Sequence, residues 1–120
     1  MAQIFPLLFS SNDVKALLGS APLRVYGWGQ APPDSVIPYV TFGVVSGVPQ
    51  NHLDSVPDMD LAATQVDIWA ATEDSSRACF AAIRDVLEAY AHMTSFSTEE
   101  FDNETKLYRT RMEFDFFEAR

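Results

Sequence analysis

Hydrophobic residues in the first part of the chain recur with a helical period that is interrupted once. Over residues 4–18 they fall three or four positions apart, except at the polar run 10–13. Ser, Asn and Asp cap helix starts and Gly favours helix ends, so the pattern predicts two short helices, the second ending at Gly19. Residues 23–28 then predict a short strand before a Pro-rich turn.

Alternation of apolar and polar residues predicts longer strands further on. Residues 37–45, 61–71 and 107–117 alternate clearly, and residues 93–101 alternate weakly. The expected apolar face of the last strand consists of Tyr108, Thr110, Met112, Phe114 and Phe116. Because one face of each strand is apolar and the other polar, we expect a sheet covered by helices on one side.

The clearest helical period lies in residues 73–91. Its apolar positions are Phe80, Ile83, Val86, Leu87 and Tyr90. Thr72 predicts an N-cap, and the two acids after it suit the positive end of the helix dipole. Cys79 lies in this run, where a small buried hydrophobe is expected rather than a nucleophile. A single cysteine excludes an internal disulfide and fits a reducing compartment.

Residues 46–60 follow neither period. Glycine, prolines and acids separate scattered apolar residues, among them Val48, Leu53 and Val56. This composition predicts a loop of 15 residues, longer than hairpins normally use. We expect this loop to be mobile in the free protein and to become ordered on a partner.

These elements predict one α+β domain spanning residues 1–120. The expected sheet has four or five strands, mostly antiparallel or mixed, with two or three helices packed on it. A chain of 120 residues is long enough for one hydrophobic core.

The charge is strongly acidic, with 17 acids against 8 bases and a formal net charge of −9. No Lys or Arg lies between Arg24 and Arg77, or between Arg84 and Lys106. Nucleic-acid binding needs a basic footprint, so this balance argues against it. The acids either keep the protein soluble by mutual repulsion or form a surface that repels other polyanions.

The N-terminus does not resemble a signal peptide, because it has no basic region and Pro6 interrupts its apolar run. No apolar stretch approaches the ~20 residues that a membrane span requires. We therefore expect synthesis in the cytoplasm and no membrane partner.

No group of residues predicts catalysis or metal binding. His52 and His92 are far apart in sequence and lack neighbouring ligands, and the acids of residues 54–60 do not follow a calcium-loop pattern. The segment Gly27-Trp28-Gly29 is not followed by the Lys-Ser/Thr pair that a phosphate-binding loop requires. We expect no metal, no cofactor and no enzymatic activity.

Several residues are instead candidates for contacts with other proteins. Trp69 falls on the polar face of its strand, and Phe96, Phe101 and Phe117 have no evident core partner. Surplus aromatics in a small chain favour a protein interface, unless the N-terminal helices cover them. The apolar residues of the predicted loop, Val48, Leu53 and Val56, are further candidates.

Lys106, Arg109 and Arg111 form a basic strip on the last strand. In a head-to-tail assembly this strip can meet an acidic strip on the next subunit. Alternatively, Arg109 and Arg111 pair within the subunit, with Glu113, Asp115 or acids of a neighbouring strand.

The order of these features resembles the tail terminator or tail completion proteins of long-tailed bacteriophages, including the small lambda-type terminator. The resemblance spans nearly the whole chain and rests on residues 14–19, 37–42, 65–69 and 108–114. No single motif is specific; their order and spacing carry the likeness.

The resemblance implies a structural virion protein of the tail–neck region. It would form a six-membered ring that caps the tail tube, stops its polymerisation and provides the head–tail joining surface. The implied partners are other copies of the chain, the major tail tube protein and a head-side connector or neck protein. DNA would pass through without specific binding. The alternatives are a head-side neck or connector ring, and a small host-type ligand-binding or enzymatic domain.

Overall fold

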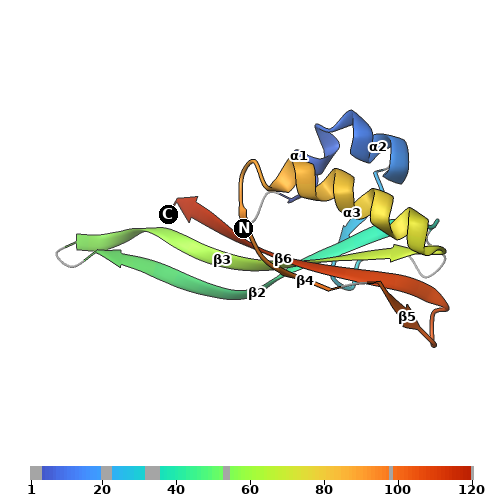
Figure 1. The fold of residues 1–120 in the computed structure, drawn as a ribbon. Coiled ribbons are helices and arrows are strands. Elements are labelled where there is room, and N and C mark those ends of the chain that lie inside the picture. The colour runs from blue at the N-terminus through green and yellow to red at the C-terminus, as the bar shows by residue number, and fades with distance from the viewer. Residues whose placement is uncertain (1–3, 20–22, 32–35, 53–54, 98, 120) are drawn as a thin grey trace.

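The computed structural model describes residues 4–19, 23–31, 36–52, 55–97 and 99–119, with the backbone alone for residues 46–62 and 117–119. Three helices lie on one face of a strongly extended sheet (Figure 1). The sheet continues well beyond the helices, which gives the molecule an elongated shape of 51 × 29 × 24 Å.

Helix α1 spans Ile4–Phe9, α2 spans Asn12–Leu18 and α3 spans Glu73–Leu87. Helices α2 and α3 begin after capping residues, and α2 ends before a glycine, as predicted. The hydroxyl of Ser11 accepts a hydrogen bond from the backbone N–H of Val14, and that of Thr72 accepts one from Ser75. After α2, Gly19 adopts a φ of 82° and donates to the carbonyl of Lys15. Glycine tolerates this left-handed φ without strain, so the predicted helix stop is confirmed.

In the described residues six strands form one mixed sheet, one strand more than the four or five expected. They are β1 (Val25–Gly27), β2 (Tyr39–His52), β3 (Ser55–Ala70), β4 (His92–Phe96), β5 (Glu100–Asp102) and β6 (Leu107–Ala119). The order is β1-β2-β3-β6-β4, and β5 pairs with β6 as well. β1 and β2 are parallel, and the other pairs are antiparallel. The predicted α+β class is confirmed, whereas the expected strand over 93–101 is divided into β4 and β5.

The predicted loop over residues 46–60 is wrong for residues 46–52 and 55–60. There β2 and β3 continue as paired strands, and Gln50 still pairs with Met59. We call residues 46–60 the arm; residues 53 and 54 lie outside the described residues. The arm forms the green extension at the left of Figure 1. Pairing between backbones does not need a hydrophobic period, and two register shifts in β2 absorb the irregular sequence. Among the described residues, Pro49 and Pro57 lie where their strands pair on one side only, a position that tolerates proline.

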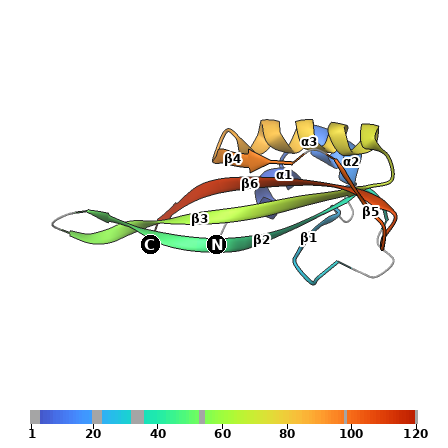
Figure 2. The ribbon, with the colours of Figure 1, turned by 60° about the horizontal axis from the view of Figure 1, so that its bottom comes forward.

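Figure 2 shows from a second direction that the helices lie on one side of the sheet. The core lies between these two layers. Its largest fully buried side chains include Ile4, Leu8, Ile68, Ile83, Met112 and Phe114. The predicted apolar faces of β3 and β6 are confirmed. The helix predicted over residues 73–91 is shorter than expected. α3 ends at Leu87, so Tyr90, a predicted apolar position of this helix, lies beyond it with 64% of its surface exposed.

A buried polar contact joins the two layers. The hydroxyls of Ser76 on α3 and Thr110 on β6 are 2.5 Å apart, and both residues are buried. Each hydroxyl satisfies the other, so neither is buried without a hydrogen-bond partner.

Candidate interaction surfaces

The face of the sheet opposite the helices carries a cross-strand row of large side chains. Tyr39, Trp69 and Arg109 are direct neighbours on β2, β3 and β6. The Tyr39 and Trp69 rings stack with centroids 6.2 Å apart, and the Arg109 guanidinium lies 5.7 Å from the Trp69 ring centre. Trp69 Nε1 donates to the hydroxyl of Thr41 at 3.2 Å. The N-terminal helices lie on the other face of the sheet. Trp69 is therefore partly covered by side chains of the neighbouring strands and not by those helices.

Two further aromatic side chains extend this row toward β1. The Tyr26 ring lies 6.3 Å from that of Tyr39. Trp28 lies over Gly43, where an added Cβ would collide with the indole ring, and 45% of the surface of Trp28 is exposed. We call Tyr26, Trp28, Tyr39 and Trp69 the outer aromatic surface. This surface was not predicted from the sequence, although a glycine among the outward positions of β2 was a signal for a ring above the backbone.

The two arginines of the basic strip pair within the subunit. Arg111 Nε lies 3.3 Å from Oδ1 of Asp67 on β3, and Arg109 lies 3.5 Å from a carboxylate oxygen of Glu100 on β5. Asp67 is 6% exposed and also accepts two hydrogen bonds from Gln65. Both arginine side chains remain partly exposed, so these internal pairs leave them accessible to another protein.

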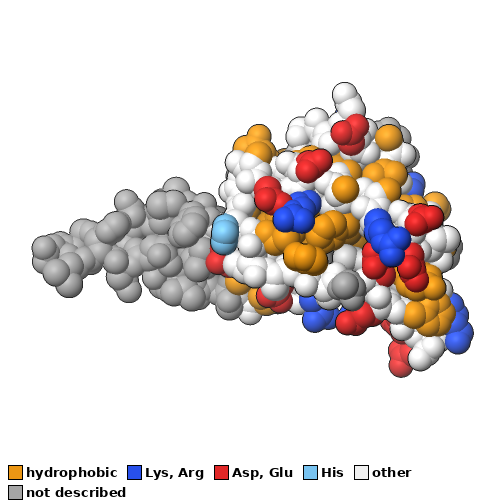
Figure 3. Space-filling model, in the orientation of Figure 1, with side chains coloured by type: hydrophobic (Ala, Val, Ile, Leu, Met, Phe, Trp, Pro, Cys, Tyr) orange, Lys and Arg blue, Asp and Glu red, His pale blue; other side chains and the backbone are white. Residues whose placement is uncertain are grey.

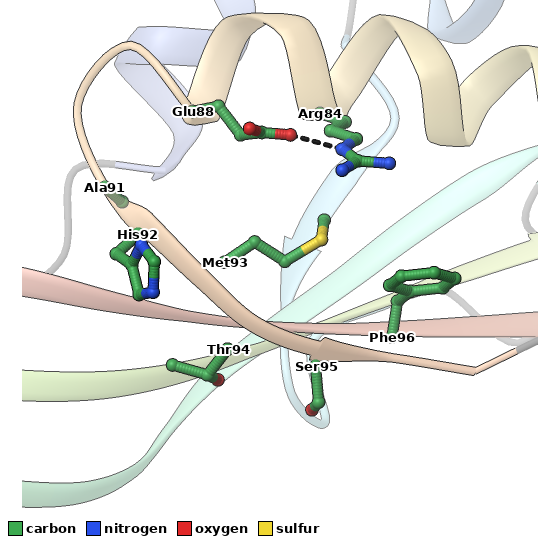
Figure 4. A pocket seen from close by; sticks show the side chains of 8 residues that line it. All are labelled: Arg84, Glu88, Ala91, His92, Met93, Thr94, Ser95 and Phe96. Carbon is green, nitrogen blue, oxygen red and sulfur yellow. Dashed lines mark hydrogen bonds and ion pairs between the residues drawn. The ribbon is translucent and has the colours of Figure 1, made fainter.

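Phe96 lies beside a groove at the opposite edge of the sheet. Its ring is 57% exposed and lies 5.5 Å from the ring of Phe80 on α3. The Arg84 guanidinium lies 5.8 Å from both ring centres and forms an ion pair with Glu88. The groove has a volume of about 580 Å³ and is lined by Arg84, Glu88, Ala91, His92, Met93, Thr94, Ser95 and Phe96. Figure 3 shows hydrophobic side chains gathered below α3 here, with a basic group among them, and Figure 4 shows the lining residues.

Phe101 and Lys106 lie together at the end of the sheet where β5 turns into β6. The Phe101 ring packs 5.3 Å from that of Tyr108 and is 49% exposed. Lys106 adopts a φ of 60° in the turn, and its backbone N–H donates to the carbonyl of Asp102. For three predicted contact residues the structure describes the backbone and not the side chain: Val48, Val56 and Phe117. A fourth, Leu53, lies outside the described residues.

The described residues contain no group of three or more His, Cys, Asp or Glu side chains able to hold a metal ion. His92 is exposed at the start of β4. Cys79 is fully buried, and burial raises the pKa of its thiol to about 11, against the opposing charge of Arg24. A thiol with so high a pKa stays protonated near neutral pH and is a poor nucleophile. None of the described helices is long and apolar enough to cross a membrane.

Comparisons with known proteins agree with this architecture. One solved structure with a similar chain is the virion of a native gene transfer agent particle, with a TM-score of 0.70 over 98% of this chain and 92% of that chain. The identity is 14%, so this likeness shows a shared fold. No curated protein sequence gives a significant match. The family model for tail completion protein gp17 matches residues 2–118, and the chain therefore belongs to the tail completion protein gp17 family.

Proposed function

We propose that this structural tail protein forms a ring on the end of the tail tube, stops tube polymerisation and provides the surface that joins the head. The observation that carries this proposal is the match to the tail completion family over residues 2–118. The similarity to a chain in a phage-like virion particle supports it, because that chain is also part of a particle.

The surfaces of the subunit suit assembly better than catalysis. Accessible aromatic side chains occur on the outer sheet face, at the β4 edge and at the β5–β6 end, and buried cores of interfaces are enriched in such residues. The net charge of −9 suits a ring through which DNA passes without being held, because like charges repel. The partners in this proposal are other copies of the chain, the tail tube protein and a head-side neck protein.

The capping role is tested by polymerising purified tail tube protein with and without this chain. The proposal expects shorter tubes with a ring at one end, seen by electron microscopy. Unchanged tube length and ends, together with binding to head-side connector particles, would contradict tail capping and favour a neck ring.

The basic strip supplies one subunit contact in this proposal. Changing Lys106 and Arg109 together to Glu reverses its charge, and it leaves the Arg111–Asp67 pair in place. We expect a folded protein that assembles poorly at low salt, where charge contacts are strongest. Arg77→Glu is the matched control, because Arg77 is an exposed base on α3 that pairs with acids of its own subunit. Normal assembly of the double variant would show that the basic strip is not part of the subunit interface.

A further inference from the structure

We propose that the exposed edge of β4, with the groove beside it, is the acceptor for the arm of a second copy of this chain. The added arm would continue the sheet of the first subunit through backbone hydrogen bonds. The inference rests on the proposed ring, and it names the contact by which one subunit adds to the next.

The β4 edge has the features of a strand-pairing site. β4 pairs with β6 on one side, and among the described residues no strand pairs with its other side. Its sequence, His-Met-Thr-Ser-Phe, contains no Lys, Glu or Pro, the residues with which proteins commonly protect an exposed edge. The register shift between Met93 and Ser95 is the one protecting device seen along this strand.

The groove provides space for side chains of an added strand. Figure 4 shows Met93 and Phe96 pointing from β4 toward α3, with Arg84 and Glu88 on the helix above them. Side chains alternate between the two faces of a strand, so every second residue of a strand added beside β4 would enter this groove. There it would bury exposed surface of Phe96 and reach the Arg84 guanidinium.

The tip of the arm has no neighbouring strand beyond its own hairpin to stabilise it among the described residues. Within the described residues, β6 pairs with β3 from Met59 onward, so residues 50–52 and 55–58 of the arm belong to two paired strands with no third strand beside them. An isolated two-stranded hairpin is marginally stable in water, and docking on another sheet would stabilise it.

Charge also favours the arm as the occupant. The arm contains Asp54, Asp58 and Asp60 and no Lys or Arg. The charged residues that line the groove, Arg84 and Glu88, pair with each other, and β4 carries no Lys, Arg, Asp or Glu, so the groove has no net charge. Elsewhere, a chain with a net charge of −9 would on average repel this acidic segment.

The arm and the β4 edge are different parts of the surface, as Figure 1 shows. A contact between them is head-to-tail, the kind of contact that produces rings when the rotation closes. Pairing of one β4 edge with another would instead produce a two-fold dimer.

Disulfide trapping in the full-length chain tests this contact. Thr94→Cys places a thiol on the exposed β4 edge and is combined with Ser55→Cys or Val56→Cys in the arm. Adjacent strand residues face opposite ways, so one of the two arm positions should reach Thr94→Cys. The control pairs the same arm cysteines with Ala78→Cys, at an exposed position of α3 outside the groove lining. The native Cys79 is buried and can remain.

We expect one Thr94→Cys pair to form a ladder of cross-linked multimers on a non-reducing gel, and the Ala78→Cys pairs to remain uncross-linked. Rings without a ladder would overturn the arm contact and leave the proposed ring intact. Strong dimers from Thr94→Cys alone would show that β4 edges pair with each other, which also overturns it. A chain that stays monomeric and uncross-linked would contradict both the contact and the ring.

A charge variant gives an independent measurement that does not depend on disulfide geometry. Thr94→Glu places an acid on the edge that receives the acidic arm, and we expect subunit association to weaken by about tenfold or more. Ala78→Glu adds the same charge to α3 and should leave association unchanged. Equal association of the two variants would contradict the proposal.

Discussion

The two faces of β6 differ in almost every respect although their residues alternate along one strand. On the helix side, Thr110, Met112, Phe114 and Phe116 are buried in the core. On the other side, Arg109, Arg111, Glu113 and Asp115 remain partly exposed, and both arginines pair with acids of neighbouring strands. The first face determines whether the subunit folds. We expect the second face, apart from the Arg111–Asp67 pair, to tolerate changes with little effect on folding, which leaves it available for assembly.

The largest contrast between the faces should come from Phe114. It is fully buried, so Phe114→Ala removes a large side chain and leaves a cavity, at a cost of about 3 to 5 kcal/mol in the free energy of unfolding. Asp115→Ala, the adjacent residue on the other face, should change it by no more than about 0.5 kcal/mol. Chemical denaturation of both variants measures the difference. Similar losses would contradict the division between the two faces.

The buried Cys79 thiol on α3 should make the protein less stable at alkaline pH. The folded-state pKa of Cys79 is raised from 9.0 to about 11, so folding favours the protonated thiol. Its contribution is complete below about pH 9 and is lost as pH rises to about 11, about 2 to 3 kcal/mol in all. Burial also raises the pKa of Tyr39, so the titration is best compared in a Tyr39→Phe background. There, Cys79→Ala should abolish the loss between pH 9 and 11, and a persistent loss would show that another group causes it.

The buried Ser76–Thr110 hydrogen bond allows a polar contribution to the free energy of unfolding to be measured on the helix side of the sheet. Thr110→Val leaves the buried Ser76 hydroxyl without its partner, and we expect a loss of about 1 to 3 kcal/mol. Adding Ser76→Ala removes the orphaned hydroxyl and should recover part of that loss in thermal or chemical unfolding. A double variant less stable than Thr110→Val would show that the two hydroxyls do not depend on each other.

The smallest effect on folding is expected on the uncovered face. Arg109→Glu breaks an exposed ion pair with Glu100, so the free energy of unfolding should fall by less than about 1 kcal/mol. Assembly should nevertheless decrease, because Arg109 belongs to the proposed basic strip. Arg111→Ala is the informative companion, since it deprives the buried Asp67 of its cation and should cost more in stability. If Arg109→Glu proved the more destabilising of the two, the outer face would be structural.

The same comparison explains which features could be predicted from the sequence. Local signals were sufficient for the caps at Ser11 and Thr72 and for the alternating faces of β3 and β6, because short-range chemistry determines them. The arm could not be predicted, because pairing between β2 and β3 determines its structure and its residues show no period. Pairing across strands also determines the outer aromatic surface, where Trp28 reaches Gly43 from a distant position in the sequence.

Among the candidate contact residues, the sequence predicted Trp69, Phe96 and Phe101 as surface aromatics, and all three retain exposed surface. It did not place them together, and in the structure they lie on three separate parts of the subunit. Their roles as contacts remain predictions.

The central claim, that this tail completion protein works as a closed ring, is tested most directly by the mass and symmetry of its assembled form. Light scattering and electron microscopy should be performed on the protein alone and on the protein bound to tail tubes. We expect a closed ring of six subunits, each of 13.4 kDa, at the tube end. A protein that stays monomeric or forms only two-fold dimers, both in solution at high concentration and with tubes present, would contradict it.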